Sequence, residues 1–271
     1  MSSKVLYQRE DHVVTITINR PEVMNAIDGE TAAALVEAWQ AFRDDDEAFV
    51  AIMTGVGDRA FSAGADLKWV ASLGGLRANV DRQRVSVYNS PGAIGYTRGV
   101  DIFKPTIAAV NGYCFAGGFE TALWCDIRIA TEHAEFGMLN RRWNVPSIDG
   151  CTVRLPRIVG LGRALDLLIT GRRISAREAL DMGLVSEVVP LERLMPRCRE
   201  LAATICSFPQ GALRSDKEAL LLGLGRPLEE GYRIEAELGA TLQYRSVTPS
   251  EGARAFAEHK RMPEQWKDHG L

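Results

Sequence analysis

The sequence predicts an α/β fold that ends in a helical region. Short runs of β-branched residues alternate with amphipathic helical segments up to about residue 150, and the pattern is then almost entirely helical. Hydrophobic residues make up 46% and charged residues 25% of the 271 positions, which is the composition of a globular protein. A chain of this length suits one large domain, with or without a helical extension.

The N-terminal part predicts a hairpin, a helix and a buried strand. The hairpin joins strands at residues 4–9 and 12–19, and the second strand is rich in Val, Ile and Thr. Asp28 is the expected N-cap of a helix over residues 29–44, because apolar side chains recur there at helical spacing. An apolar run at residues 49–54 predicts the buried strand.

Strands and helices continue to alternate beyond this point. Two further apolar strands are expected at residues 106–110 and 126–130, and a later one at 185–189. Residues 72–91 combine Gly and Arg without a clear apolar face at their start, so we interpret them as a candidate lid over a site. The predicted helices of the second half lie at residues 153–159, 163–169, 176–182, 191–207, 211–224, 228–246 and 253–261.

The charge balance does not favour a polyanionic partner. There are 32 Lys and Arg residues against 35 Asp and Glu, a formal net charge of -3, so nucleic acid is not the expected partner. We see no N-terminal targeting pattern and no run of ~18 apolar residues. We therefore expect a cytoplasmic protein that does not interact with a membrane.

The cysteines and histidines do not predict a metal site. Both sets are scattered, without a Cys-x-x-Cys pair or the spacing of metal ligands, and we expect the thiols to be buried and reduced. The residues are Cys114, Cys125, Cys151, Cys198 and Cys206, and His12, His133, His259 and His269.

Two glycine-containing turns carry the chemical signal. The first, Phe-Ser-Ala-Gly-Ala-Asp-Leu at residues 61–67, follows a buried strand and precedes a helix. The second runs from residue 104 through Gly117-Gly118 to Glu120. Small residues let a backbone approach a ligand closely, and the first amides of a helix lack partners within it. Two N–H donors from separate loops can therefore meet around one oxygen.

These turns resemble two landmarks of the enoyl-CoA hydratase/isomerase (crotonase) superfamily. Three more landmarks occur in matching order: Asn-Arg-Pro-Glu-Val-Met-Asn-Ala at 19–26, Leu-Ile-Thr-Gly-Arg-Arg-Ile-Ser-Ala at 168–176 and Glu-Gly-Ala-Arg-Ala-Phe at 251–256. The resemblance covers essentially the whole chain. It implies a crotonase-like spiral of repeated β-β-α units over residues 1–190. It also implies a C-terminal helical region, residues 191–271, that serves trimerisation in a homotrimer or hexamer (dimer of trimers).

The resemblance also implies an enzyme that holds the oxygen of an acyl-coenzyme A thioester as an enolate. By position, the backbone N–H groups of Ala63 and Gly117 would form the oxyanion hole. Glu120 matches one of the two glutamates that hydratases of this family use as acid and base. No cofactor is implied, because coenzyme A is part of the substrate.

The first turn is similar to the CoA-binding loop of this family. Ala65, Asp66 and Leu67 are therefore candidates to line the adenine pocket, with Ala26 and Lys68 nearby. Asp66 has a second interpretation as the N-cap of the following helix, and the two roles are compatible.

The second glutamate of the family is missing. It would come four residues after Phe136, where this sequence has Asn140, whose amide can orient water or substrate but cannot act as an ordinary acid or base. Asp149 is a candidate replacement for it. Asp149 is equally suited to be the N-cap of the helix predicted at 153–159, so both interpretations stay open.

Three bulky residues follow Asn140. Arg141 and Arg142 suit an acidic substrate group, or an ion pair with a nearby carboxylate of the site, and Trp143 suits a core as well as a ligand stack. The resemblance therefore does not predict which acyl group the substrate carries.

Several functions fit these residues. Hydration of a 2-enoyl-CoA needs two proton-transfer groups, here Glu120 and Asp149, and we favour it because it is the commonest activity in the family. Isomerisation of a double bond needs Glu120 alone. A CoA-ester hydrolase and a non-catalytic member that binds acyl-CoA or RNA are the remaining alternatives, and the retained Glu120 and Gly117 argue against the last.

Overall fold

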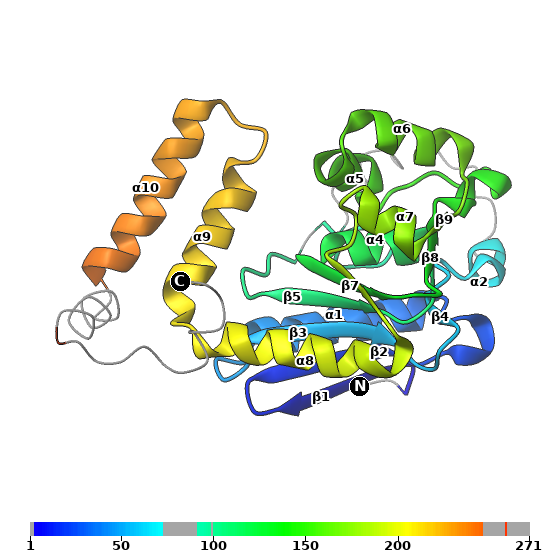
Figure 1. The fold of residues 1–271 in the computed structure, drawn as a ribbon, viewed down its shortest axis with the longest axis horizontal. Coiled ribbons are helices and arrows are strands. Elements are labelled where there is room, and N and C mark those ends of the chain that lie inside the picture. Colours follow the sequence, from blue (N-terminus) through cyan, green and yellow to red (C-terminus); the bar gives the residue numbers. More distant parts are fainter. Residues whose placement is uncertain (1–2, 73–90, 99, 246–257, 259–271) are drawn as a thin grey trace.

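The computed structural model describes residues 3–72, 91–98, 100–245 and 258 (Figure 1). Most of the candidate lid, residues 73–90, and most of the helix predicted at 253–261 lie outside the described residues. No helix among the described residues is long and apolar enough to cross a membrane.

The larger sheet has six strands. Its first two strands form the predicted antiparallel hairpin, and every later strand joins its neighbour in parallel. The spatial order is β1 (Val5–Glu10), β2 (Val13–Ile18), β3 (Val50–Gly55), β5 (Thr106–Val110), β7 (Ile127–Thr131) and β10 (Glu187–Val189).

A second, smaller sheet lies at the end of the first. Its strands are two or three residues long, too short to show a periodic pattern in the sequence, and they were not predicted. They are β4 (Ala60–Ser62), β6 (Tyr113–Phe115), β8 (Glu135–Gly137) and β9 (Ile174–Ser175), in that order across the sheet.

The chain winds between the two sheets in repeated β-β-α units. Each of β3, β5 and β7 in the large sheet leads directly into β4, β6 and β8 in the small one, and a helical segment follows each pair. These segments are α2 (Leu67–Ser72), α4 (Gly117–Trp124) and the 3-10 helix η2 (Leu139–Trp143) with α5 (Cys151–Val159). The predicted spiral of β-β-α units is confirmed.

Both faces of the large sheet are buried. Alternate residues of β3 divide between them: Val50 and Ile52 pack with α8 (Leu191–Ser207), whereas Ala51 and Met53 join the core that contains α1 (Gly29–Asp44). This double burial is typical of parallel sheets. It also makes α8, which we assigned to the C-terminal region, part of the packing of the core.

The other elements lie around this body. The short helix η1 (Pro21–Val23) precedes α1, and α6 (Leu161–Thr170) and α7 (Ala176–Asp181) follow α5. The last two helices, α9 (Gln210–Gly223) and α10 (Leu228–Arg245), form a hairpin that extends away from the sheets (Figure 1). All five cysteines are free thiols, four of them buried and Cys206 partly buried, as predicted.

Candidate active site

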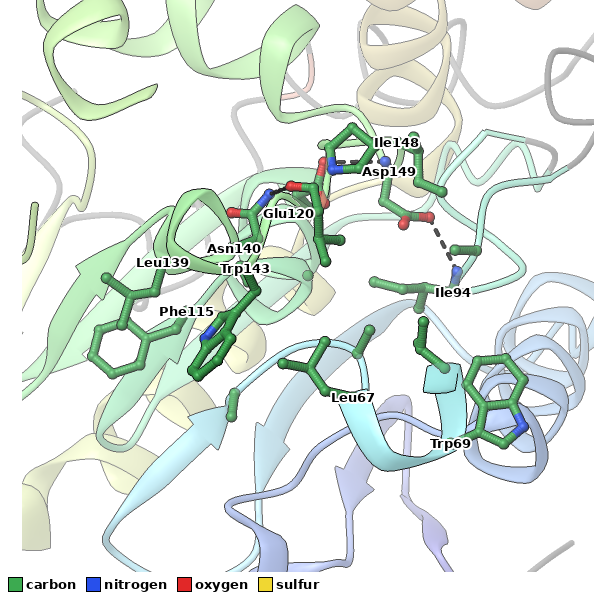
Figure 2. Close-up of a pocket in the computed structure, with 18 residues that line it drawn as sticks. Leu67, Trp69, Ile94, Phe115, Glu120, Leu139, Asn140, Trp143, Ile148 and Asp149 are labelled. Carbon is green, nitrogen blue, oxygen red and sulfur yellow. Dashed lines mark hydrogen bonds between the residues drawn. The ribbon is translucent and has the colours of Figure 1, made fainter. Parts of the chain in front are cut away.

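The main pocket opens between α2, the start of α4, η2 and the turn before α5 (Figure 2). Its volume is about 520 Å³, and most of its lining is apolar. Phe115, Leu139 and Trp143 gather at one end. Three side chains supply polar groups to the lining, and they are Glu120, Asn140 and Asp149. An apolar pocket with a few polar groups is the usual form of a site for a small molecule.

The turn after β4 and the turn after β6 touch through their backbones at the floor of this pocket. A Cβ atom on Gly64 would lie 2.5 Å from the Gly117 nitrogen, and one on Gly118 would lie 2.2 Å from the Ser62 carbonyl oxygen. Gly64 also has a φ of +88°, in the region that favours glycine. The sequence places glycine here because no side chain fits between the two turns.

Two backbone N–H groups meet at this contact, those of Ala65 and Gly117. A Cβ atom built on Gly117 would lie 3.4 Å from the Ala65 nitrogen, so the two amides are close neighbours. Neither amide donates a hydrogen bond to another described residue, and both residues line the pocket. We refer to the N–H groups of Ala65 and Gly117 as the amide pair. It can bind an oxygen that carries negative charge.

The first donor has to be corrected from Ala63 to Ala65. Although Ala63 lines the pocket, its N–H donates to the carbonyl of Met24 at 3.0 Å and is not free for a ligand. Met24 and Asn25 both have a positive φ of 54°, an uncommon turn that the sequence analysis did not foresee. The hydrogen bonds between the loop at 61–67 and the turn at Met24 and Asn25 determine which amide of the loop has no partner among the described residues.

Gly117 owes its orientation to a strained residue. Ala116, the N-cap of α4, has φ 49° and ψ -121°, which a residue with a Cβ atom rarely adopts. The amide of Ala116 is fixed by the carbonyl of Gly137 at 2.9 Å. The surrounding sheet thus holds the turn in a conformation that leaves the next amide, that of Gly117, without a partner.

The carboxylate of Glu120 is buried in the first turn of α4. One oxygen, Oε1, accepts hydrogen bonds from the N–H groups of Asp149 and Cys151, both at 3.0 Å (Figure 2). Burial raises the pKa of Glu120 to about 7, and the nearby charge of Asp149 acts in the same direction, against the two amides. Its other oxygen, Oε2, makes no hydrogen bond with the described residues. Glu120 can therefore exchange a proton near neutral pH.

Asp149 brings a second carboxylate to the pocket. Its Oδ1 accepts hydrogen bonds from the N–H of Ile94 at 3.1 Å and the hydroxyl of Thr97 at 2.7 Å, whereas Oδ2 has no partner in the described part of the chain. The N-cap of α5 is Gly150, and the Asp149 side chain bonds to Ile94 and Thr97 and to no amide of that helix. The N-cap interpretation of Asp149 is therefore wrong.

Asn140 lines the pocket but braces its wall. Its Nδ2 donates to the carbonyl of Val145 at 2.8 Å, and its buried Oδ1 has no partner among the described residues. The amide thus holds the 140–145 turn closed. A role in orienting water or substrate stays a prediction.

The candidate CoA-binding residues divide into two groups. Ala65 and Leu67 line the pocket, and the lining formed by the described residues does not include Ala26, Asp66 or Lys68. Asp66 accepts hydrogen bonds from the amides of Lys68 and Trp69, so its N-cap role is confirmed, and it also pairs with Arg20 at 3.0 Å. Contact of these residues with coenzyme A stays a prediction.

Trp143 lines the pocket, whereas the two arginines before it do not. Trp143 lines the end of the pocket and is 68% exposed (Figure 2). Arg141 and Arg142 are exposed, and within the described chain they neither line the pocket nor pair with a carboxylate. The side chain of Arg141 donates to the Ser147 hydroxyl instead.

Three residues of the site had no signal in the sequence. Ile94 and Thr97 reach Asp149 from a segment that has no helical or strand pattern, and more than fifty positions separate them from it in the chain. Arg154 lies on the predicted helix, but nothing in its neighbourhood marks it as part of a site. Only tertiary contacts bring these residues to Asp149.

Comparison with known proteins finds relatives along nearly the whole chain. The sequence profile of a family described as enoyl-CoA hydratase/isomerase matches residues 8–269. A carnitinyl-CoA dehydratase of Salmonella enteritidis is 40% identical over 98% of this chain and 99% of its own. Among solved structures, an enoyl-CoA hydratase of Bacillus anthracis is 34% identical with a TM-score of 0.84, covering 96% of this chain and 98% of its own. One of Mycobacterium marinum is 29% identical with a TM-score of 0.85, covering 97% and 98%.

We predict that Gly64→Ala displaces the amide pair. Its Cβ would collide with the Gly117 nitrogen, whereas Gly57 has a similar φ of +86° and nothing within 4 Å of the same atom. Gly57→Ala therefore serves as the control for backbone strain alone, about 1 kcal/mol. The free energy of unfolding should fall by more in Gly64→Ala, and the amide resonance of Gly117 should shift only there. Equal effects of the two changes would contradict this view of the contact.

We also predict that Glu120 makes stability depend on pH. Because its pKa of about 7 exceeds the ordinary 4.5, the folded protein holds a proton between these values that the unfolded chain has lost. This contribution to the free energy of unfolding is complete below pH 4.5. It falls by about 3 kcal/mol as the pH rises to 7. Urea unfolding across this range should show the decline in the wild type and not in Glu120→Gln, and parallel slopes would refute it.

Proposed function

Because the chain belongs to the enoyl-CoA hydratase/isomerase family, we propose that it is a hydro-lyase that adds water to a 2-enoyl-CoA or removes it from the hydroxyacyl-CoA. The observation that carries this proposal is that two carboxylates and the amide pair line one apolar pocket. The dehydratase name of the Salmonella relatives supports a reaction of water.

The amide pair is the proposed oxyanion hole. The thioester carbonyl oxygen accepts hydrogen bonds from the N–H groups of Ala65 and Gly117, and negative charge develops on it when a nucleophile attacks the β-carbon. Each donor of this kind stabilises the transition state by roughly 3 kcal/mol, since it is already in place in a site with little water.

Glu120 and Asp149 are the proposed pair of proton-transfer groups. Burial and the nearby charge of Asp149 raise the pKa of Glu120 to about 7, so this carboxyl can hold or release a proton near neutral pH. The reaction needs one ionised and one protonated carboxyl. The ionised member takes a proton from water while the water oxygen bonds to the β-carbon. The protonated member gives its proton to the α-carbon as the enolate collapses, and the reverse steps eliminate water.

The position of Asp149 favours a hydro-lyase over an isomerase. A double-bond isomerase needs one carboxylate to move a proton between two carbons, and Glu120 would suffice. Asp149 instead lines the same pocket, and its Oδ2 has no partner among the described residues. A second acid next to the first is what the handling of a water molecule requires.

We predict that both acids are needed for hydration of crotonyl-CoA. Glu120→Gln should lower kcat by at least ~100-fold, and Asp149→Asn by a similar factor, with little change in the affinity for the CoA ester. The double change should cost much less than the product of the two, because the residues act on one water. Asp166→Asn, an exposed carboxylate on α6, is the control and should keep full activity.

One outcome would replace this proposal with the isomerase. A nearly normal kcat for hydration in Asp149→Asn would show that Asp149 is not a proton-transfer group. The wild type should then move the double bond of a 3-enoyl-CoA without taking up oxygen from labelled water. Uptake of that oxygen into the product, lost in both single variants, is the result that supports the hydro-lyase.

We further predict that α9 and α10 mediate assembly into a homotrimer or a dimer of trimers. Leu220, Leu228 and Tyr232 are exposed on this hairpin, Leu228 to 69%, and such a surface is typical of an interface. Light scattering should give the mass of a trimer or hexamer for the wild type. Leu228→Glu should shift it towards smaller species, whereas Leu6→Glu on β1 should not. A monomeric wild type would contradict the proposal.

A further inference from the structure

Arg154 lies on α5, directly behind the turn that carries Asp149 and Gly150. Its guanidinium packs against the backbone of Gly150: a Cβ atom there would lie 1.8 Å from Nη1 of Arg154. Gly150 has a φ of +107°, so the turn both requires glycine and leaves room for the cation. The guanidinium is therefore built into the wall that carries Asp149.

Arg154 closes a hydrogen-bonded ring with Asp149 and Thr97. It donates to the carbonyl of Asp149 at 2.9 Å and to the carbonyl of Thr97 at 2.5 Å. The Thr97 hydroxyl in turn donates to the Asp149 carboxylate at 2.7 Å. The planar fork of an arginine suits two acceptors at once. The ring joins the turn before α5 to the neighbouring loop of residues 91–98.

The ring fixes both carboxylates. It holds Asp149 by its backbone and by its side chain, and the amide of the same residue donates to Glu120. A shift of this turn would move one carboxylate and remove a hydrogen bond from the other. Small displacements of catalytic groups are enough to reduce rates strongly.

The charge of Arg154 is not neutralised by a direct ion pair. The salt bridges of the described residues do not include it, and its two hydrogen bonds go to neutral carbonyls. Burial lowers the pKa of Arg154, but an arginine stays protonated at any pH of interest. Its positive charge is thus felt by the two carboxylates of the pocket.

We propose that Arg154 is a positioning residue for the reaction, which sets the geometry of Glu120 and Asp149 through the ring and balances their charge. Its effect on turnover rests on the proposed function. Its effect on the titration of Glu120 does not.

Other titratable groups surround Glu120, and none of them is changed in the Arg154 variants that test this proposal. Asp149 and Cys151 approach it from the start of α5; the charge of Asp149 raises the pKa of Glu120, and the charge of Glu120 raises the pKa of Cys151. Further charged or titratable groups that act on this cluster are Arg141 of η2, Tyr96 of the 91–98 loop and Cys125 at the end of α4. Among the residues that the structure describes, Arg154 is the cation whose charge acts on Glu120 and which also interacts with Asp149.

A second cavity gives access to Arg154 from its far side. It has a volume of about 250 Å³ and is lined by Arg154, Thr97, Trp124 and Lys217, among others. A guanidinium ion can therefore reach the space that a shortened side chain leaves. This allows the missing group to be returned in solution.

The test compares Arg154→Ala, Arg154→Gln and Arg154→Lys with Arg157→Gln, an exposed arginine of the same helix. Infrared difference spectra against Glu120→Gln follow the protonation of Glu120 directly. We expect its titration to move up by about one pH unit in the Ala and Gln variants, since a nearby positive charge favours the ionised carboxylate. Arg154→Lys and Arg157→Gln should titrate as the wild type does.

Turnover of crotonyl-CoA is the second readout. kcat should fall at least ~10-fold in Arg154→Ala with KM nearly unchanged, and guanidinium chloride at low concentration should restore part of it. Arg154→Lys should lose part of kcat, because a single ammonium does not reach both carbonyls as a fork does. Arg157→Gln should behave as the wild type, with and without guanidinium.

An unchanged titration of Glu120 in Arg154→Gln, together with a lowered melting temperature and no response to guanidinium, would overturn the proposal and leave Arg154 a stabilising residue only. Should Arg154→Ala not fold, the Gln and Lys variants decide the matter. A wild type that does not hydrate crotonyl-CoA counts against the proposed function, and the infrared titration still decides on Arg154.

Discussion

The contact between the turn after β4 and the turn after β6 is the constraint on which the site depends. Two backbones approach there so closely that a single Cβ atom on Gly64 would collide with an amide nitrogen. Because the strands before both turns belong to one sheet, the sheet fixes the distance between the two amides. A pair of donors that is rigid before a ligand arrives needs no reorganisation when charge develops on that ligand.

The same contact determines where Glu120 lies. α4 starts at the strained Ala116, so the first turn of the helix carries the carboxylate inward, to a place where water does not solvate it. Two backbone amides, those of Asp149 before α5 and of Cys151 at its first position, replace part of that solvation. The carboxylate and the residues that solvate it are therefore interdependent, which is the physical basis of the effect on Glu120 that we propose for Arg154.

The sequence was sufficient to predict the elements and residues that leave a local pattern. Long buried strands such as β3 show as apolar runs, and the turn around Gly117 with Glu120 three residues later is a local motif. It was not sufficient where distant segments decide the outcome. Whether Ala63 or Ala65 keeps a free amide depends on the Met24 carbonyl, and the partners of Asp149 come from residues 94–97. The strands of the small sheet are too short to be periodic.

The hydrogen bond from Asn140 to Val145 limits the routes by which this pocket could evolve. A glutamate at position 140, as in the hydratases that the sequence resembles, has no N–H to offer the partly buried Val145 carbonyl, and the loss of this hydrogen bond costs about 1 kcal/mol. An intermediate that kept Asp149 as well would hold three carboxylates around one cavity, where like charges oppose one another's ionisation. Stepwise conversion between the two arrangements therefore passes through a variant that lacks this hydrogen bond and places like charges together. Lineages with Asn140 and with glutamate at that position should accordingly stay separate, each with its own residues at positions 145 and 149.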